Sequence, residues 1–209
     1  MGILASLLAA LVAAAPATSP DLFSELFKRS PIAQRTLHSM RAHFVETTTS
    51  SLLAAPIVAR GTLVAAPPGR LAMTYTSPEP KTLVVNSERL VVTWPQRSQR
   101  EELNIARTQE RVKKYFADAS PDQLKKNFDV RVTESAEFGG TYLVDMTPTR
   151  KQISRGLQQL QVWVDREHVQ PRQLKMIFPG GDTKTIRLDD LEPNVPITDA
   201  MFEGRIAGR

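Results

Sequence analysis

The chain has 209 residues, of which 41% are hydrophobic and 23% are charged, a composition typical of a soluble globular protein. Its formal net charge of +5 does not indicate a nucleic-acid-binding protein, because the basic residues are spread along the chain with acidic residues between them. The absence of cysteine excludes disulfides, thiolate catalysis, cysteine-ligated zinc and a lipid-modified N-terminal cysteine.

Residues 1–17 predict a secretory signal peptide. The apolar run over residues 3–15 is shorter than the roughly 20 residues that span a bilayer. Ala15 and Ala17 fit a small-x-small cleavage pattern, so we expect cleavage after Ala17 and export from the cytoplasm. The alternative, a buried N-terminal helix, is less favoured. Residues 18–209 are expected to form one domain and to act as a monomer.

Serine–proline pairs predict three helix starts, because serine caps helices and proline fits the first helical turn: Ser19-Pro20, Ser30-Pro31 and Ser120-Pro121. The first two begin a predicted pair of amphipathic helices over residues 20–40, which are either ordinary core helices or a lid over a sheet. The apolar face of this pair contains Leu22, Phe23, Leu26, Phe27, Leu37 and Met40. At the third start, Gln123 completes a capping box with Ser120.

Alternating apolar residues predict about eleven strands, interrupted by a helical segment before the capped start at Ser120. The predicted strands are residues 42–51, 56–65, 70–76, 82–85, 90–94, 102–105, 130–135, 141–146, 160–165, 173–178 and 183–188. Short connections, such as the Pro-Gly-Gly-Asp turn over residues 179–182, indicate antiparallel neighbours. The pattern therefore predicts an α+β fold whose long meander curls into a half-barrel or barrel.

No pattern of residues indicates catalysis, a metal site or a cofactor. His38, His43 and His168 fit no metal-ligand spacing, and no Gly-x-Ser-x-Gly motif is present. The adjacent acid pairs point to opposite faces of a strand and so cannot share an acid/base site: Glu101-Glu102 and Asp189-Asp190. We therefore do not expect an enzyme.

Apolar residues on one face of the predicted strands instead suggest the wall of a lipid-binding cavity. For any single residue, ordinary core packing is the alternative. The predicted wall consists of Phe44, Leu63, Leu71, Met73, Tyr75, Leu90, Val92, Trp94, Leu160, Val162, Val164, Leu174 and Met176.

A series of short motifs, in order along the chain, resembles the LolA-type outer-membrane lipoprotein carriers. The motifs are Phe44-Val45-Glu46, Gly61-Thr62-Leu63, Pro68-Gly69-Arg70-Leu71, Tyr75-Thr76-Ser77-Pro78, Leu83-Val84-Val85-Asn86 with Leu90, Met146-Thr147-Pro148, the strand over residues 160–164, Gly180-Gly181-Asp182 and Phe202. The resemblance implies an incomplete antiparallel β-barrel closed by a helical lid, with an apolar cavity for acyl chains.

The resemblance also implies a periplasmic carrier that moves lipoproteins from an inner-membrane ABC transporter to an outer-membrane receptor. The receptor of that system is lipid-anchored, so the lack of cysteine favours the carrier. Glu46 stands where the family commonly has glutamine, and Pro67 stands where the best-known carriers have a lid-latching arginine. Proline has no donor, so we expect apolar contacts to hold the lid. The alternatives are a periplasmic lipid or lipoprotein sensor, a glycolipid-binding module of the same fold, and a secreted lipid-processing enzyme.

Overall fold

The computed structural model describes the following residues: 21–30, 35–67, 69–112, 115 and 120–204. The predicted signal peptide over residues 1–17 lies outside them, as do the predicted helix starts at Pro20 and Pro31.

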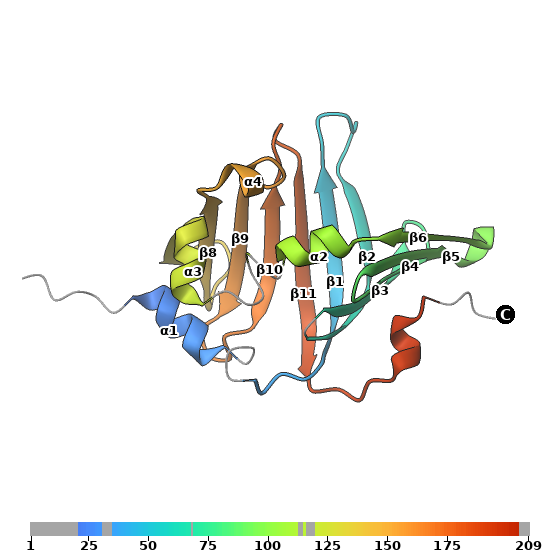
Figure 1. Cartoon of the computed structure of the whole chain (residues 1–209), viewed down its shortest axis with the longest axis horizontal. Coiled ribbons are helices and arrows are strands. Elements are labelled where there is room, and N and C mark those ends of the chain that lie inside the picture. The colour runs from blue at the N-terminus through green and yellow to red at the C-terminus, as the bar shows by residue number, and fades with distance from the viewer. Residues whose placement is uncertain (1–20, 31–34, 68, 113–114, 116–119, 205–209) are drawn as a thin grey trace, which may run out of the picture.

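An open antiparallel sheet of eleven strands makes up most of the described chain (Figure 1). Its strands are β1 (Met40–Thr49), β2 (Ile57–Ala66), β3 (Arg70–Ser77), β4 (Lys81–Asn86), β5 (Arg89–Trp94), β6 (Gln99–Asn104), β7 (Phe128–Glu134), β8 (Thr141–Pro148), β9 (Gln159–Asp165), β10 (Pro171–Ile177) and β11 (Thr183–Pro193). Their order is β6-β5-β4-β3-β2-β1-β11-β10-β9-β8-β7, so β6 and β7 form the edges while β1 and β11 meet at the centre. The predicted α+β half-barrel is confirmed.

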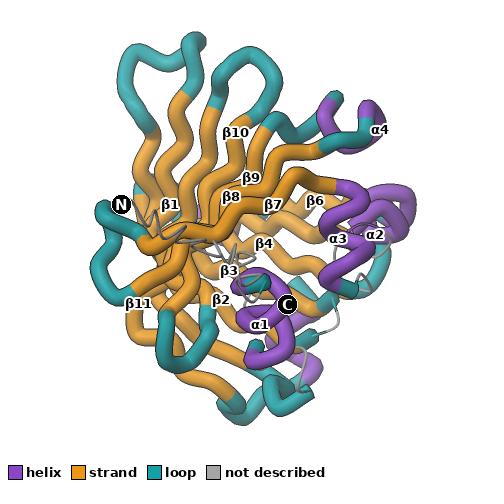
Figure 2. The backbone as a smooth tube through the Cα atoms, turned by 90° about the vertical axis from the view of Figure 1, so that its left-hand side faces the viewer, coloured by secondary structure: helices purple, strands orange, loops and turns teal. Residues whose placement is uncertain are grey.

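Three helices lie on the same side of the curled sheet (Figure 2). They are α1 (Leu22–Arg29), α2 (Ala106–Val112) and α3 (Pro121–Asn127). We call the sheet face against which α1 and α3 pack the inner face, and the opposite face the outer face. The short elements α4 (Lys151–Ser154), η1 (Pro95–Arg97) and η3 (Asp199–Phe202) complete the described structure.

Local sequence signals explain where α3 begins and where two hairpins turn. The Ser120 hydroxyl accepts a hydrogen bond from the Gln123 N–H, and the Gln123 side chain accepts one from the Ser120 N–H, which confirms the capping box. Gly180 and Gly181 have φ angles of 97° and 89°, which confirms the turn between β10 and β11. Ser87 has a φ angle of 53° in the β4–β5 turn, where glycine fits better.

The prediction of a second lid helix was wrong for residues 35–40. Met40 begins β1, and Leu37 precedes it in irregular structure. The cause is a set of contacts with distant residues that follow β11. The Asn194 side chain accepts from the His38 N–H at 2.9 Å and donates to the Thr36 carbonyl at 3.0 Å. These bonds occupy the backbone groups that a helix would use.

The chain after β11 covers part of the outer face. Phe202 in η3 is 1% exposed and packs with Ala66, Ala72, Val84 and Val91 of β2 to β5. The Arg70 guanidinium lies 4.9 Å from the centre of the Phe202 ring. The segment that contains η3 therefore stabilises strands β2 to β5, which we call one wing of the sheet, from the face opposite α1 and α3.

Candidate functional site

The register of the sheet places every predicted wall residue on the inner face. Residues directly opposite one another on neighbouring strands point to the same side. One such row crosses β2 to β5 and another crosses β9 to β1: Leu63, Met73, Leu83 and Val92, then Val162, Leu174, Ile186 and Glu46. The remaining predicted wall residues lie at even spacings from these rows.

The predicted wall residues differ in burial. Phe44, Leu63, Met73 and Tyr75 are buried, with exposed fractions of 7% or less, and form a core at the centre of the sheet. The others are half-buried: Leu71, Leu90, Val92, Trp94, Leu160, Val162, Val164, Leu174 and Met176. These half-buried apolar side chains form an accessible surface on the inner face.

The centre of the wall includes a close approach between an aromatic ring and the backbone. Phe44 and Tyr75 meet edge to face, with ring centres 5.0 Å apart. Gly61 lies opposite both residues, and a Cβ atom there would come within 2.9 Å of the Phe44 ring and 2.0 Å of the Thr74 carbonyl oxygen. Glycine is required at this position because the neighbouring strand and ring leave no room for a side chain.

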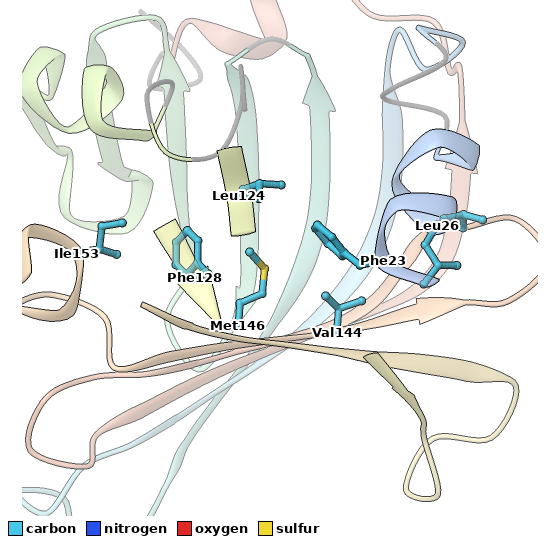
Figure 3. Close-up of a cluster of buried hydrophobic side chains, with 8 residues drawn as sticks. Phe23, Leu26, Leu124, Phe128, Val144, Met146 and Ile153 are labelled. Carbon is cyan, nitrogen blue, oxygen red and sulfur yellow. The ribbon is translucent and has the colours of Figure 1, made fainter. Parts of the chain in front are cut away.

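Helices α1 and α3 cover the β7–β9 part of the inner face. Phe23, Leu26 and Leu124 pack against Val144 and Met146 (Figure 3). Leu22 and Phe27 pack against the same cluster, so the four predicted lid residues of α1 lie on the inner face. Polar contacts also hold α1, because Asp21 forms an ion pair with Lys125 of α3. The second covering helix is thus α3, rather than the predicted helix at residues 31–40.

Leu37 and Met40, which were predicted to lie on the lid, line a small apolar pocket instead. The pocket holds a space of about 90 Å³ between Leu37, Met40, Pro67 and Leu191. Pro67 thus lies beside an apolar residue of the segment that precedes β1. An apolar latch at Pro67 remains a prediction.

The β4–β6 wing of the inner face includes apolar residues that the sequence analysis did not assign to the wall. Leu83 and Val85 of β4 lie on this face, as does Leu103 of β6, which is opposite Leu90. Leu103 is 54% exposed. Its strand is otherwise polar, so the alternation signal was weak there, and only pairing with β5 reveals its direction.

A polar cluster interrupts the apolar wall. The Glu46 side chain is 12% exposed; it accepts a hydrogen bond from the Tyr75 hydroxyl at 3.0 Å and from the Lys184 ammonium at 2.9 Å. Burial raises the pKa of Tyr75 well above its usual range, and the neighbouring Glu46 carboxylate adds to the effect. The hydroxyl therefore stays a donor. On the other side of Tyr75, the Lys81 ammonium lies 4.7 Å from the ring centre.

Two larger clefts are open and have charged side chains in their lining, which does not suit an acyl chain. One holds about 500 Å³ beside α3 and includes Lys126, Asn127 and Arg150. The other holds about 410 Å³ on the outer face and includes Arg60, Arg187 and Asp189.

The histidines do not assemble a chemical site. His43 and His168 are exposed and contact Asp190 and Asp165, each at 3.2 Å. Across the described residues, no group of three or more potential metal ligands comes together. In the same part of the chain, no helix is long and apolar enough to cross a membrane.

Residues 35–204 match the sequence model of a family described as outer membrane lipoprotein carrier protein LolA. A search of curated proteins found no match. The fold is similar to that of lipoprotein LppX from Mycobacterium tuberculosis, with a TM-score of 0.53 and 12% identity over 86% of this chain and 99% of that chain. It is also similar to a chain of the MucA/MucB complex from Pseudomonas aeruginosa, with a TM-score of 0.50 and 16% identity over 86% of this chain and 60% of that chain. At these identities, the similarities to solved structures concern the fold alone.

Proposed function

The chain belongs to the LolA family of outer membrane lipoprotein carrier proteins, and from this premise we propose that it is a non-enzymatic carrier for the acyl chains of lipoproteins. Its inner face takes the place of the bilayer around those chains. We further propose that it works in the periplasm after removal of residues 1–17, and that residues 18–209 form one domain. An inner-membrane transporter delivers the cargo in this proposal, and an outer-membrane receptor takes it.

The observation that carries the proposal is the half-buried apolar surface of the inner face. Leu71, Leu90 and Trp94 lie on one wing, and Leu160 and Leu174 lie on the other, with none of them fully covered. Burying one methylene group is worth about 0.8 kcal/mol, so a surface of this kind stabilises a long acyl chain that water does not solvate.

The test is whether the protein keeps an acylated lipoprotein in solution through this face. Purified protein is mixed with a triacylated lipoprotein in detergent, the detergent is removed, and the soluble complex is measured by native mass spectrometry. We expect a stoichiometric complex with the wild type. Leu71→Glu places a carboxylate against the acyl chains, which costs several kcal/mol, so the yield of complex should fall at least about tenfold.

Thr74→Glu provides the matched control. Thr74 is an exposed residue of the same strand and points to the outer face. This variant should retain the yield of the wild type. Equal yields for Leu71→Glu and Thr74→Glu, or no complex with the wild type, would contradict carriage on the inner face.

A further inference from the structure

One end of the inner face combines cationic groups with the apolar wall. Tyr75 of β3 lies directly opposite Lys81 of β4. Glu46 of β1 lies opposite Ile186, two residues from Lys184 of β11 on the same side of the sheet. All four polar residues of the cluster therefore face the space where an acyl chain is proposed to lie: Glu46, Tyr75, Lys81 and Lys184.

The charges in this cluster are not balanced. The Glu46 carboxylate accepts hydrogen bonds from Lys184 and from Tyr75. The cluster therefore has two lysines and one acid, and the acid is paired with Lys184. Lys81 contacts the face of the Tyr75 ring and, among the described residues, forms no ion pair. A ring face attracts an ammonium group less strongly than a carboxylate or phosphate does. Lys81 is thus the cation available to an anion.

The surroundings of Lys81 suit the head of an amphiphile. Lys81 is half-buried, and the next inward residue of its strand is Leu83. Leu83 lies opposite Val92 of β5. The next inward residue of β4, Val85, lies between Leu71 of β3 and Leu90 of β5, so the apolar surface continues away from Lys81. An acyl chain along this row would bring its polar end to the ammonium group.

We propose that Lys81 binds the anionic head group, a carboxylate or a phosphate, of an amphiphile whose acyl chain lies on the inner face. Glu46 holds Lys184 and Tyr75 in place and leaves a single uncompensated positive charge at Lys81. Because the site is partly shielded from water, an ion pair there is stronger than one at the open surface. This inference rests on the proposed function, since it requires acyl chains on the inner face.

The test separates recognition of the head from recognition of the chain. The probes are cis-parinaric acid and its methyl ester, which share one fluorescent chain and differ in charge. We expect the wild type to bind the acid about tenfold more tightly than the ester, as a charge-assisted hydrogen bond implies. Lys81→Met retains the length of the side chain and removes the charge. It should bring the two affinities to within about twofold and leave the affinity for the ester unchanged.

Lys175→Met is the control, because Lys175 lies on the outer face between Leu174 and Met176. It should keep the preference for the acid. Equal affinities for acid and ester in the wild type, or an equal loss of both probes in Lys81→Met, would overturn the assignment of Lys81 while leaving carriage intact. If the wild type binds neither probe, the proposed function and this inference both fail.

The source of the anion is resolved by competition. Oleate presents a carboxylate, oleoyl lysophosphatidic acid presents a phosphate, and monooleoylglycerol presents a neutral head on the same chain. We expect one or both anionic lipids to displace cis-parinaric acid from the wild type at least about fivefold more effectively than monooleoylglycerol does, and this advantage to vanish in Lys81→Met. The stronger of the two anionic competitors identifies the head group. Equal displacement by all three lipids would contradict a head-group site.

Discussion

Asp165 closes the turn that leads from β9 into β10. Its Oδ1 atom accepts hydrogen bonds from the backbone N–H groups of Glu167 at 3.0 Å and His168 at 2.8 Å. Burial on its own raises the pKa of Asp165, but the backbone bonds from His168 and Glu167 together with the His168 side chain outweigh it, so the pKa lies below its usual value. The unfolded chain therefore binds this proton more readily. The carboxylate stabilises the fold above the unfolded pKa of about 3.9, and this contribution is lost as the pH falls through the lower folded pKa.

Replacing this carboxylate should give a pH-dependent loss of stability. We expect Asp165→Asn to lower the free energy of unfolding by about 1 kcal/mol at pH 7, because neutral hydrogen bonds replace charge-assisted ones. The difference from the wild type should shrink as the pH falls below about 4, measured by urea unfolding at pH 7, 5 and 3. Asp129→Asn serves as the control, because the Asp129 side chain is 58% exposed and its ion pair with Arg131 is a surface pair of small energy. A loss of equal size at all three pH values would show that charge is not the cause.

Helix α1 is a short element held to the inner face by apolar contacts and by the Asp21–Lys125 ion pair. It has eight residues, and its N-cap residue Asp21 makes no side-chain capping bond. Phe23 and Leu26 attach it to the inner face through apolar contacts, which an acyl chain could replace. A short helix without such contacts is not stable in water. We therefore expect the opening of α1 to be coupled to cargo binding.

Hydrogen exchange should report this coupling. In the protein without lipid, we expect faster exchange in residues 22–29 than in β1 and β11, and slower exchange in α1 when oleate binds. Helix α3 has a capping box and runs directly into β7, so it should respond less. Identical exchange in α1 with and without oleate, while oleate remains bound, would show that α1 does not move with the cargo.

The sequence predicts an element well where local pattern and long-range pairing agree. Period-two alternation places Leu71, Met73 and Tyr75 on one face, and the neighbouring strands do so too, which makes both the sheet and the direction of the wall predictable. The segment before β1 differs. Its local pattern is helical, but the side chain of Asn194, which is distant in sequence, forms hydrogen bonds with the backbone of His38 and Thr36. The four-residue helix α4 is too short to leave a periodic pattern.

Over the whole molecule, the outer and inner faces are stabilised by different groups. On the outer face, Phe202 packs with Ala66, Ala72, Val84 and Val91. The sheet separates this group from the apolar residues of the inner face. Phe202→Ala should lower the free energy of unfolding by about 3–5 kcal/mol in urea titrations. At temperatures where the variant remains folded, its affinity for cis-parinaric acid should equal that of the wild type.

Met201→Ala is the control for this prediction, since Met201 is the neighbouring residue and is 44% exposed. It should change stability by less than about 0.5 kcal/mol. A loss of lipid affinity in folded Phe202→Ala would show that the two faces are coupled through the sheet.

The polar cluster on the inner face was beyond prediction from the sequence. Glu46 and Lys184 are 138 positions apart, and their contact depends on the pairing of β1 with β11. The sequence alone identified Glu46 only as a departure from the family pattern. Lys81 stands at the start of its strand, and no local signal shows that it faces the same space.

The pairing of β1 with β11 also sets the time at which the protein can fold. β1 stays without its central neighbour until residues 183–193 have been synthesised, because these residues form β11. Contacts between residues so far apart in sequence form slowly, on the scale of about milliseconds to seconds. Until then no strand pair joins β2–β6 to β7–β10, and we expect the sheet to remain in two parts. A protein built in this order is therefore expected to complete its inner face only when its last strand is in place.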